Sequence, residues 1–423
     1  MGKLNVKRIE KIFRPDPSRV IIKSHIPSDA GRMKSIIARI LNLSEEESDK
    51  LLQNTIENFS GRHKNIWDAL DKHYNRIKKY IPSGLEINDI KRALLGAYFS
   101  LEYSVQSAAF FNPSIVKHPD QSQVPEGSMR FILSFRSVGE GHISSIEFRS
   151  GIVDEEGKFE FDEVSPFVER AVAVSNPMYG KEIFFCKLEE MHEDCSSLSY
   201  LKEELSDEFT LSELRELLNL ASKRDIRGIQ ETMLWLAESN YELQFRIDQK
   251  LSERIIFPRS QNESNGIEDA RFVRFEYDGG EVVYYATYTA YNGFKILPQI
   301  LETKDFLNFK AITLNGEYAA NKGMALFPKK INGKYMVISR IDGENLYTMS
   351  SEDIHFWETS NLLKQPEYDW ELIQIGNCGS PIETDRGWIV LTHGVGPMRK
   401  YCLGAILLDL EDPTKVIGSR SPY

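Results

Sequence analysis

The pattern of hydrophobic and polar positions divides the chain into helical and β segments. Residues 28–110 carry apolar side chains at helical spacing, and Ser44-Glu45-Glu46-Glu47 is a capping box that opens one of these helices. A second helical stretch covers about 186–250, where Thr210-Leu211-Ser212-Glu213 is another capping box. A short strand is predicted at 19–22, ahead of the first helices.

Short strands separated by turn residues fill most of the remaining chain. They are predicted at 130–136, 144–149, 170–175, 271–277, 282–289, 294–300, 323–328, 334–339, 345–349, 381–384, 387–393 and 401–409. So many closely spaced strands suggest a sandwich, a barrel or a propeller. Leu297 to Phe309 and Leu346 to Trp357 share a strand, a Ser/Thr-x-Asp step and an aromatic residue. A repeat of about fifty residues favours propeller blades.

Composition narrows the function classes. The chain has 423 residues and a net charge of −11, which argues against nucleic acid as a main partner. No apolar run is long enough to cross a membrane, and no signal peptide is visible. Its four cysteines (Cys186, Cys195, Cys378 and Cys402) form no Cys-x-x-Cys pair, which favours reduced thiols in a cytoplasmic protein. No cluster has metal-ligand spacing, so we expect no metal.

Candidate chemistry concentrates in Gly266-Ile267-Glu268-Asp269-Ala270-Arg271 and the aromatic strand Val282 to Tyr291. Carboxylates transfer protons, Arg holds anions, and Tyr and Thr hydroxyls suit a sugar. In an extended strand Glu268 and Asp269 would face opposite ways, which leaves Asp269 as a lone acid. Two structural alternatives stay open: a surface ion pair between Asp269 and Arg271, and plain strand packing by the tyrosines.

Several ordered motifs together resemble glycoside hydrolase family 130. Besides the two segments above, the resemblance rests on Phe111-Asn112-Pro113-Ser114, Phe135-Arg136, Asn321-Lys322-Gly323-Met324, Ser339-Arg340, Gly379-Ser380-Pro381, His393-Gly394-Val395 and Tyr401-Cys402-Leu403-Gly404. It covers about 111–423 outside the helical insertion. The helical segments lie outside the compact family core and indicate a longer branch.

The resemblance implies a mainly β fold, a five-bladed β-propeller with its active site at the central channel and with added N-terminal and inserted helices. Residues 1–110 would form an N-terminal strand and helical region, and 111–423 the catalytic propeller with an insertion at about 186–250. The chain stops at Tyr423 where another blade segment would begin. A natural terminus and an incomplete last blade both remain open.

The activity implied is inverting phosphorolysis of a β-mannoside to α-mannose 1-phosphate, with inorganic phosphate as co-substrate and no other cofactor. Asp269 would be the general acid, its proton relayed through a sugar hydroxyl. A phosphorylase needs one acid and a cationic pocket, since phosphate is already an anionic nucleophile. The implied phosphate-binding residues are Lys322, Arg340, His393, Tyr401 and Asn321. The implied substrate-binding residues are Asn112, Arg136, Glu140, Glu268, Arg271 and Tyr288.

Three alternatives remain open at this point. An inverting hydrolase would need a second carboxylate ~6.5–9.5 Å from the acid, and Glu140, in the loop Gly139-Glu140-Gly141-His142 that departs from the family pattern, is a candidate base. A mannosyltransferase is the second alternative. The third is a non-catalytic carbohydrate-binding propeller whose helices dock a partner or mediate homo-oligomer assembly.

Overall fold

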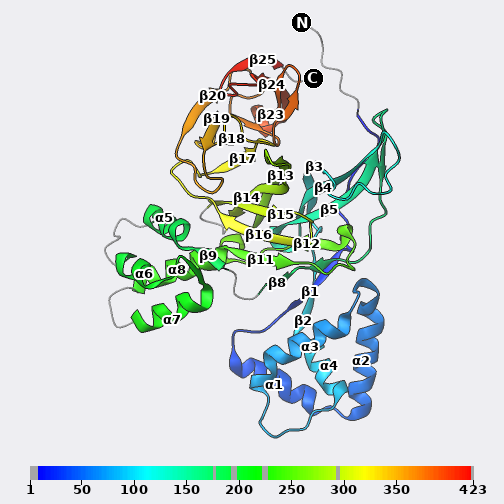
Figure 1. Cartoon of the computed structure of the whole chain (residues 1–423). Helices are drawn as coiled ribbons and strands as arrows, with labels where there is room; N and C mark the ends of the chain where they lie inside the picture. Colours follow the sequence, from blue (N-terminus) through cyan, green and yellow to red (C-terminus); the bar gives the residue numbers. More distant parts are fainter. Residues whose placement is uncertain (1–7, 175–177, 192–197, 222–226, 292–295, 421–423) are drawn as a thin grey trace. The chain divides into compact units, whose positions relative to one another are not determined.

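The computed structural model describes residues 8–174, 178–191, 198–221, 227–291 and 296–420. The chain forms two compact units (Figure 1). The first comprises Met1–Phe111, Ser137–His142 and Val164–Glu169, and the second comprises Asn112–Arg136, Ile143–Glu163 and Arg170–Tyr423.

The first unit is a helical bundle with a two-stranded sheet. Its elements are β1 (Val20–Ser24), α1 (Ala30–Leu41), α2 (Glu45–Phe59), α3 (Ile66–Ile77), α4 (Asp89–Tyr98) and β2 (Ser100–Ser104). The predicted capping box is confirmed: Ser44 accepts from the Glu47 amide while Glu47 accepts from the Ser44 amide. Helices α3 and α4 approach so closely that a Cβ on Gly96 would lie 2.1 Å from the Leu70 carbonyl oxygen. Only glycine fits this crossing.

The second unit is built mainly from antiparallel meanders. The described part of the chain forms four of them: β3–β6 (Ala109–Lys117, Met129–Val138, Ser144–Val153, Phe159–Phe161), β13–β16 (Gly266–Glu276, Val282–Tyr291, Ile296–Thr303, Asn308–Thr313), β17–β20 (Lys322–Leu326, Tyr335–Arg340, Leu346–Ser351, Ser360–Lys364) and β21–β25 (Gln374–Asn377, Ile382–Thr384, Gly387–Val395, Tyr401–Leu408, Val416–Arg420). Short β7 (Glu169–Arg170), β8 (Val172–Ala173), β11 (Tyr241–Gln244) and β12 (Arg254–Ile256) pair around the first two meanders. A four-stranded meander is the unit of a propeller blade.

The predicted repeat has a structural basis. In the turn after β15, the Thr303 hydroxyl accepts from the Phe306 amide at 2.9 Å, and Asp305 accepts from the Leu307 amide at 2.8 Å. After β19, Ser351 accepts from the Asp353 amide at 3.1 Å, and Asp353 from the His355 amide at 2.8 Å. The same Ser/Thr-x-Asp turn therefore joins the third and fourth strands of two successive blades.

The inserted segment folds into its own helical layer beside the second meander, coloured green in Figure 1. It consists of β9 (Met178–Gly180), α5 (Lys181–Met191), α6 (Leu198–Glu204), β10 (Glu208–Thr210), α7 (Leu211–Ala221) and α8 (Arg227–Ser239). Thr210 and Glu213 form the second predicted capping box, which is confirmed. A separate core that includes Phe184, Phe209 and Met233 holds the helices together.

These elements confirm a mainly β fold with added N-terminal and inserted helices. Three strands differ from the predicted pattern. Strand β2 lies at the end of the predicted N-terminal helical region, and β10 and β11 lie inside the predicted helical stretch 186–250. In each place strand pairing decides the conformation, because β2 pairs with β1, β10 with β9 and β11 with β16.

Candidate active site

The acidic residue at the centre of the motif lies at a kink in β13. The register of β13 against β14 shifts between Glu268 and Arg271, so two residues of β13 oppose one of β14. Asp269 has a φ of 55°, in the left-handed region that a non-glycine residue rarely adopts. Such bulges re-aim a side chain, and strained backbone of this kind gathers at functional sites.

The bulge brings both carboxylates to one guanidinium. Arg136, on β4, lies 3.3 Å from Asp269 Oδ1 through Nη1 and 2.7 Å from Glu268 Oε1 through Nη2. Asn112, on β3, donates to the same Asp269 oxygen. The prediction that Glu268 and Asp269 face opposite ways is therefore wrong. It assumed an extended strand, and the positive φ of Asp269 breaks the alternation on which that inference depended.

Glu268 is fully engaged by cations. Its Oε1 meets Arg136, and its Oε2 lies 2.6 Å from the Nζ of Lys322 on β17. The ammonium group of Lys322 also lies over the ring of Tyr291, 5.6 Å from its centroid. Only 12% of the Glu268 side chain is exposed, against 30% for Asp269. Glu268 thus orders the cations, while Asp269 is the more accessible carboxylate.

The arginines Arg271 and Arg340 form a second group of cations in the site. A Cβ on Gly323 would lie 3.4 Å from Arg271 Nη1 and 3.5 Å from Arg340 Cβ, so both side chains lie against the Gly323 backbone. Arg271 donates to Asn377 at 3.2 Å. The Nε of Arg340 is buried without a hydrogen-bond partner among the described residues. Burial lowers the pKa of both guanidinium groups, and the negative charge of Asp269 offsets this effect only in part.

His393 completes this cationic side. Gly376 on β21 pairs with His393 on β23, and a Cβ on Gly376 would lie 2.8 Å from the His393 ring and 3.1 Å from Arg340 Nη1. The ring of Tyr401 stacks on His393 with centroids 6.0 Å apart. Burial, and then Arg271 and Arg340, lower the pKa of His393 to about 4. At neutral pH it is an uncharged hydrogen-bonding group.

The electrostatics of Asp269 depend on the same cations. Burial raises its pKa, but Arg271, Arg136 and Lys322 together with the Asn112 hydrogen bond outweigh burial and lower it. An anion bound against Arg271 and Arg340 would cancel part of that effect. The proton affinity of Asp269 is thereby coupled to anion binding.

Not every sequence-predicted residue is placed in this group. Tyr288 is buried in the core, and its hydroxyl contacts Glu263 at 3.0 Å and Gln299 at 2.8 Å, away from Asp269. Glu140 belongs to the first unit, where its carboxylate accepts from the Ser104 amide at 3.1 Å. Asn321 precedes Lys322 and has a φ of 59°. The predicted substrate-binding roles of Tyr288 and Glu140 and the predicted phosphate-binding role of Asn321 stay predictions.

Two supporting residues escaped sequence reasoning. The Ser144 hydroxyl accepts from Arg136 Nε at 2.9 Å, and Asn377 orients Arg271. The backbone does carry a signal for the site. Positive φ angles occur at Asn112, Asp269 and Asn321. These residues lie in or just before the first strands of three successive meanders. Asn and Asp tolerate this conformation better than other non-glycine residues.

The described ranges contain neither a candidate metal-ligand cluster nor a candidate membrane-spanning helix. No group of three or more His, Cys, Asp or Glu side chains there could hold a metal ion. Within the same residues, no helix has the length and apolar character needed to span a bilayer.

The chain is similar to characterised mannoside phosphorylases. Residues 228–423 match the model of a family described as β-1,4-mannooligosaccharide phosphorylase. The chain is 33% identical over 177 residues to a 1,2-β-oligomannan phosphorylase of Thermoanaerobacter sp. (strain X514), covering 40% of this chain and 56% of that protein. It is 32% identical over 190 residues to a β-1,2-mannobiose phosphorylase of Listeria innocua, covering 43% of this chain and 50% of that protein.

A solved structure of β-1,2-mannobiose phosphorylase from Listeria innocua in complex with β-1,2-mannobiose aligns with 76% of this chain and 77% of that chain, at a TM-score of 0.38 and 20% identity. The chain spans about half the length of the curated relatives it matches. The matched segment contains Asp269, Lys322, Arg340 and His393. Residues 228–423 are therefore similar to glycoside hydrolase family 130.

Proposed function

We propose that this site catalyses inverting phosphorolysis of a β-mannoside to α-mannose 1-phosphate. The observation that carries the proposal is the partly buried pair Arg271 and Arg340, which no carboxylate neutralises by an ion pair within the described residues. Burying charge without a partner is costly, so such a pair is suited to an anionic ligand. Arg in particular binds phosphate through its planar fork.

In this mechanism, phosphate lies against Arg271, Arg340 and neutral His393. A phosphate oxygen attacks the anomeric carbon from the face opposite the leaving group, the glycosidic C–O bond breaks, and the departing oxygen takes a proton that originates at Asp269. One phosphate and one mannoside thus yield α-mannose 1-phosphate and the shortened acceptor. The negative charge of phosphate raises the pKa of Asp269, so the nucleophile would help to keep its own acid protonated.

Hydrolysis is disfavoured by the second carboxylate. An inverting hydrolase needs a base that activates water, but both oxygens of Glu268 are taken by Arg136 and Lys322. The curated relatives that match this chain carry names of mannoside phosphorylases. These names support a mannosyl donor and a phosphate co-substrate for this chain.

The assay measures release of mannose 1-phosphate from β-1,2- and β-1,4-mannobiose, with and without inorganic phosphate. We expect turnover only with phosphate, its loss in Asp269→Asn, and a rise of at least tenfold in the KM for phosphate in Arg340→Gln. Lys329→Gln is the control, because Lys329 forms an exposed pair with Glu383. Equal turnover without phosphate would establish hydrolysis instead.

We further propose a reducing, cytoplasmic location. Cys186, Cys378 and Cys402 are free thiols in the structure, and disulfides are rare in that compartment. Cys195 lies outside the described residues. Assembly into a homo-oligomer through the helices stays a prediction.

A further inference from the structure

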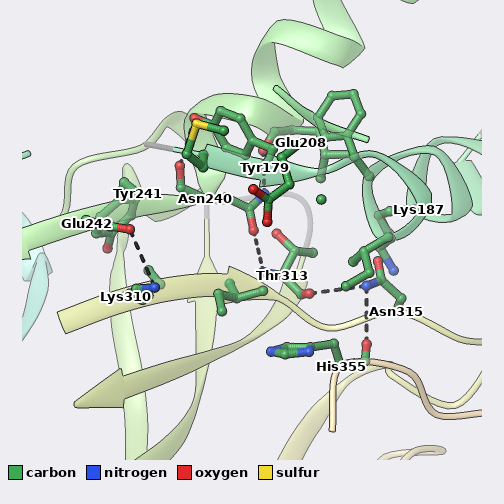
Figure 2. Close-up of a pocket in the computed structure, with 17 residues that line it drawn as sticks. Tyr179, Lys187, Glu208, Asn240, Tyr241, Glu242, Lys310, Thr313, Asn315 and His355 are labelled. Atoms are coloured by element: carbon green, nitrogen blue, oxygen red, sulfur yellow. Dashed lines mark hydrogen bonds and ion pairs between the residues drawn. The ribbon is translucent and has the colours of Figure 1, made fainter. Parts of the chain in front are cut away.

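A cavity of about 240 Å³ lies between the inserted helices and the blade formed by β13–β16 (Figure 2). One wall comes from β9, α5 and α8 of the insertion, and the other from β11, β16 and the segment that contains His355. In Figure 2, Tyr179 and Glu208 lie across the cavity from His355. None of the residues placed around Asp269 lines it.

Three partly buried hydrogen bonds fix the two walls. Glu190 on α5 accepts from the amide of Gly316, just after β16, at 2.5 Å. The Thr313 amide donates to the side chain of Asn240 at 2.8 Å, and the Tyr179 hydroxyl donates to the Asn240 carbonyl at 3.1 Å. The cavity is therefore a formed site, since its opposite sides are tied together rather than merely adjacent.

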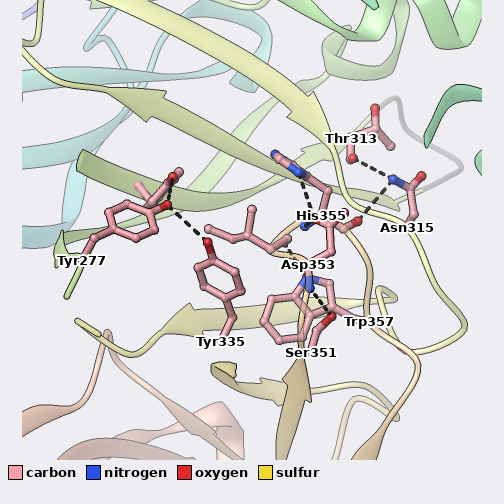
Figure 3. A network of polar contacts seen from close by, with 10 residues as sticks. Tyr277, Thr313, Asn315, Tyr335, Ser351, Asp353, His355 and Trp357 are labelled. Carbon is pink, nitrogen blue, oxygen red and sulfur yellow. Dashed lines mark hydrogen bonds and ion pairs between the residues drawn. The ribbon is translucent and has the colours of Figure 1, made fainter. Parts of the chain in front are cut away.

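Two residues that line the cavity each have one buried hydrogen-bonding atom without a partner among the described residues. These atoms are Oδ1 of Asn315 and Nε2 of His355. Asn315 is only 1% exposed, and its amide group donates to the carbonyls of His355 and Thr313 at 3.2 and 3.4 Å, which fixes its orientation. His355 Nδ1 lies 3.2 Å from Asp353 Oδ1 (Figure 3). The carboxylate accepts a hydrogen bond from Nδ1–H, and in this tautomer of the neutral ring Nε2 is an acceptor.

Unpartnered buried acceptors are costly, and two in one cavity call for a ligand with several hydrogen-bond donors. The charged groups of the lining balance: Lys187 and Lys310 oppose Glu208 and Glu242. Lys187 is already paired with Glu190 at 2.7 Å. A charged ligand would thus gain little net attraction. Much of the uncharged lining, including Tyr179, Phe184 and Ile312, is apolar.

We propose that this cavity binds a small neutral polyhydroxy ligand, a single sugar ring. Its hydroxyls would donate to Asn315 and His355, and its C–H face would cover the apolar wall. The volume lies below the range of about 300–1,000 Å³ that drug-sized ligands occupy, which limits the occupant to about one ring. This second carbohydrate site is independent of the proposed phosphorolysis, because it depends on the insertion and on residues outside the Asp269 group.

Histidine NMR can report on the two sites separately. The chain has eight histidines, so a ¹⁵N-histidine-labelled sample gives few imidazole signals, and His355→Phe assigns the one at the cavity. D-mannose is titrated in, with inorganic phosphate as a second, anionic probe. We expect a saturable shift of the His355 Nε2 signal with mannose and none with phosphate. His393 reports the candidate active site in the same spectra.

Gly180→Phe is the blocking variant. Gly180 lines the cavity, and a Cβ added there meets nothing within 4 Å, so the backbone tolerates the side chain while the ring fills the space. We expect mannose affinity at His355 to fall at least tenfold, with the His393 response unchanged. Gly61→Phe, also in open space but in the first unit, is the matched control. An unresponsive His355 signal, a shift with phosphate alone, or an identical titration in Gly180→Phe would overturn the proposal.

Discussion

Gly376 leaves the space that His393 occupies. A Cβ at Gly376 would lie 2.8 Å from Cε1 of the His393 ring. Because these contacts are with side-chain atoms rather than backbone, we expect Gly376→Ala to displace the ring without unfolding the sheet. The KM for phosphate should rise about tenfold, equivalent to about 1.4 kcal/mol. Gly279→Ala, which meets nothing within 4 Å, is the control. An unchanged KM in Gly376→Ala would show that the ring position is immaterial to phosphate binding.

The charge of Glu268 should set the pH range of activity. Glu268 lies between Arg136 and Lys322, two cations that lower the pKa of Asp269. In Glu268→Gln these cations lose their partner, so the pKa of Asp269 falls further and the alkaline limb of kcat/KM moves to lower pH. Glu276→Gln removes an exposed carboxylate from the same strand and should leave the profile in place. An unchanged alkaline limb in Glu268→Gln would show that the charge of Glu268 does not affect the pKa of Asp269.

His393 makes stability depend on pH. Its pKa is about 4 in the folded protein, against 6.5 for the free group. The unfolded chain therefore binds the proton more tightly, and stability is lost as pH falls from about 6.5 towards 4, by roughly 3 kcal/mol at most. Asp269, with a lowered pKa, adds losses only below about pH 3.8. Thermal unfolding of wild type and His393→Gln across pH 4–7 checks this: the variant should lose less of its Tm. An equal loss of Tm with falling pH in wild type and His393→Gln would contradict the conclusion that His393 is buried and neutral.

Tyr288 should matter for stability and not for substrate affinity. Tyr288→Phe leaves the buried groups Gln299 and Glu263 with one hydrogen bond fewer, at a cost of about 1–3 kcal/mol. Unfolding by urea measures this loss, and Tyr347→Phe, whose hydroxyl donates to exposed Asp342, should change little. A raised KM for mannobiose with unchanged stability would instead make Tyr288 a substrate ligand.

The order of the motifs along the chain predicted several of the residues that lie together around Asp269. Asn112, Arg136, Asp269 and Arg340 are far apart in sequence, and their order along the chain matched a family pattern that the structure brings together. The capping boxes and the repeated Ser/Thr-x-Asp turn were equally visible, because each depends on residues only two or three positions apart.

What sequence reasoning missed came from backbone geometry and strand register. Alternation cannot reveal the bulge at Asp269, so Glu268 was assigned to the wrong face. The tyrosines of β14 all suit a strand, and periodicity alone does not say which ones reach the site. Tyr288 enters the core, whereas the ring of Tyr291 lies beneath Lys322. Ser144 and Asn377 carry no motif of their own and act only through the arginines they orient.

The positive φ angles of Asn112, Asp269 and Asn321 fall in corresponding places of three successive repeats. Each of these repeats thus places one polar side chain at a bend at or just before its first strand. The acid Asp269 and Arg271 of the anion pocket share β13, whereas Lys322, Arg340 and His393 come from β17, β18 and β23. The kink at Asp269 therefore sets the position of the proton donor and of one phosphate-binding arginine together, so a change in that one bend would disturb both halves of the reaction.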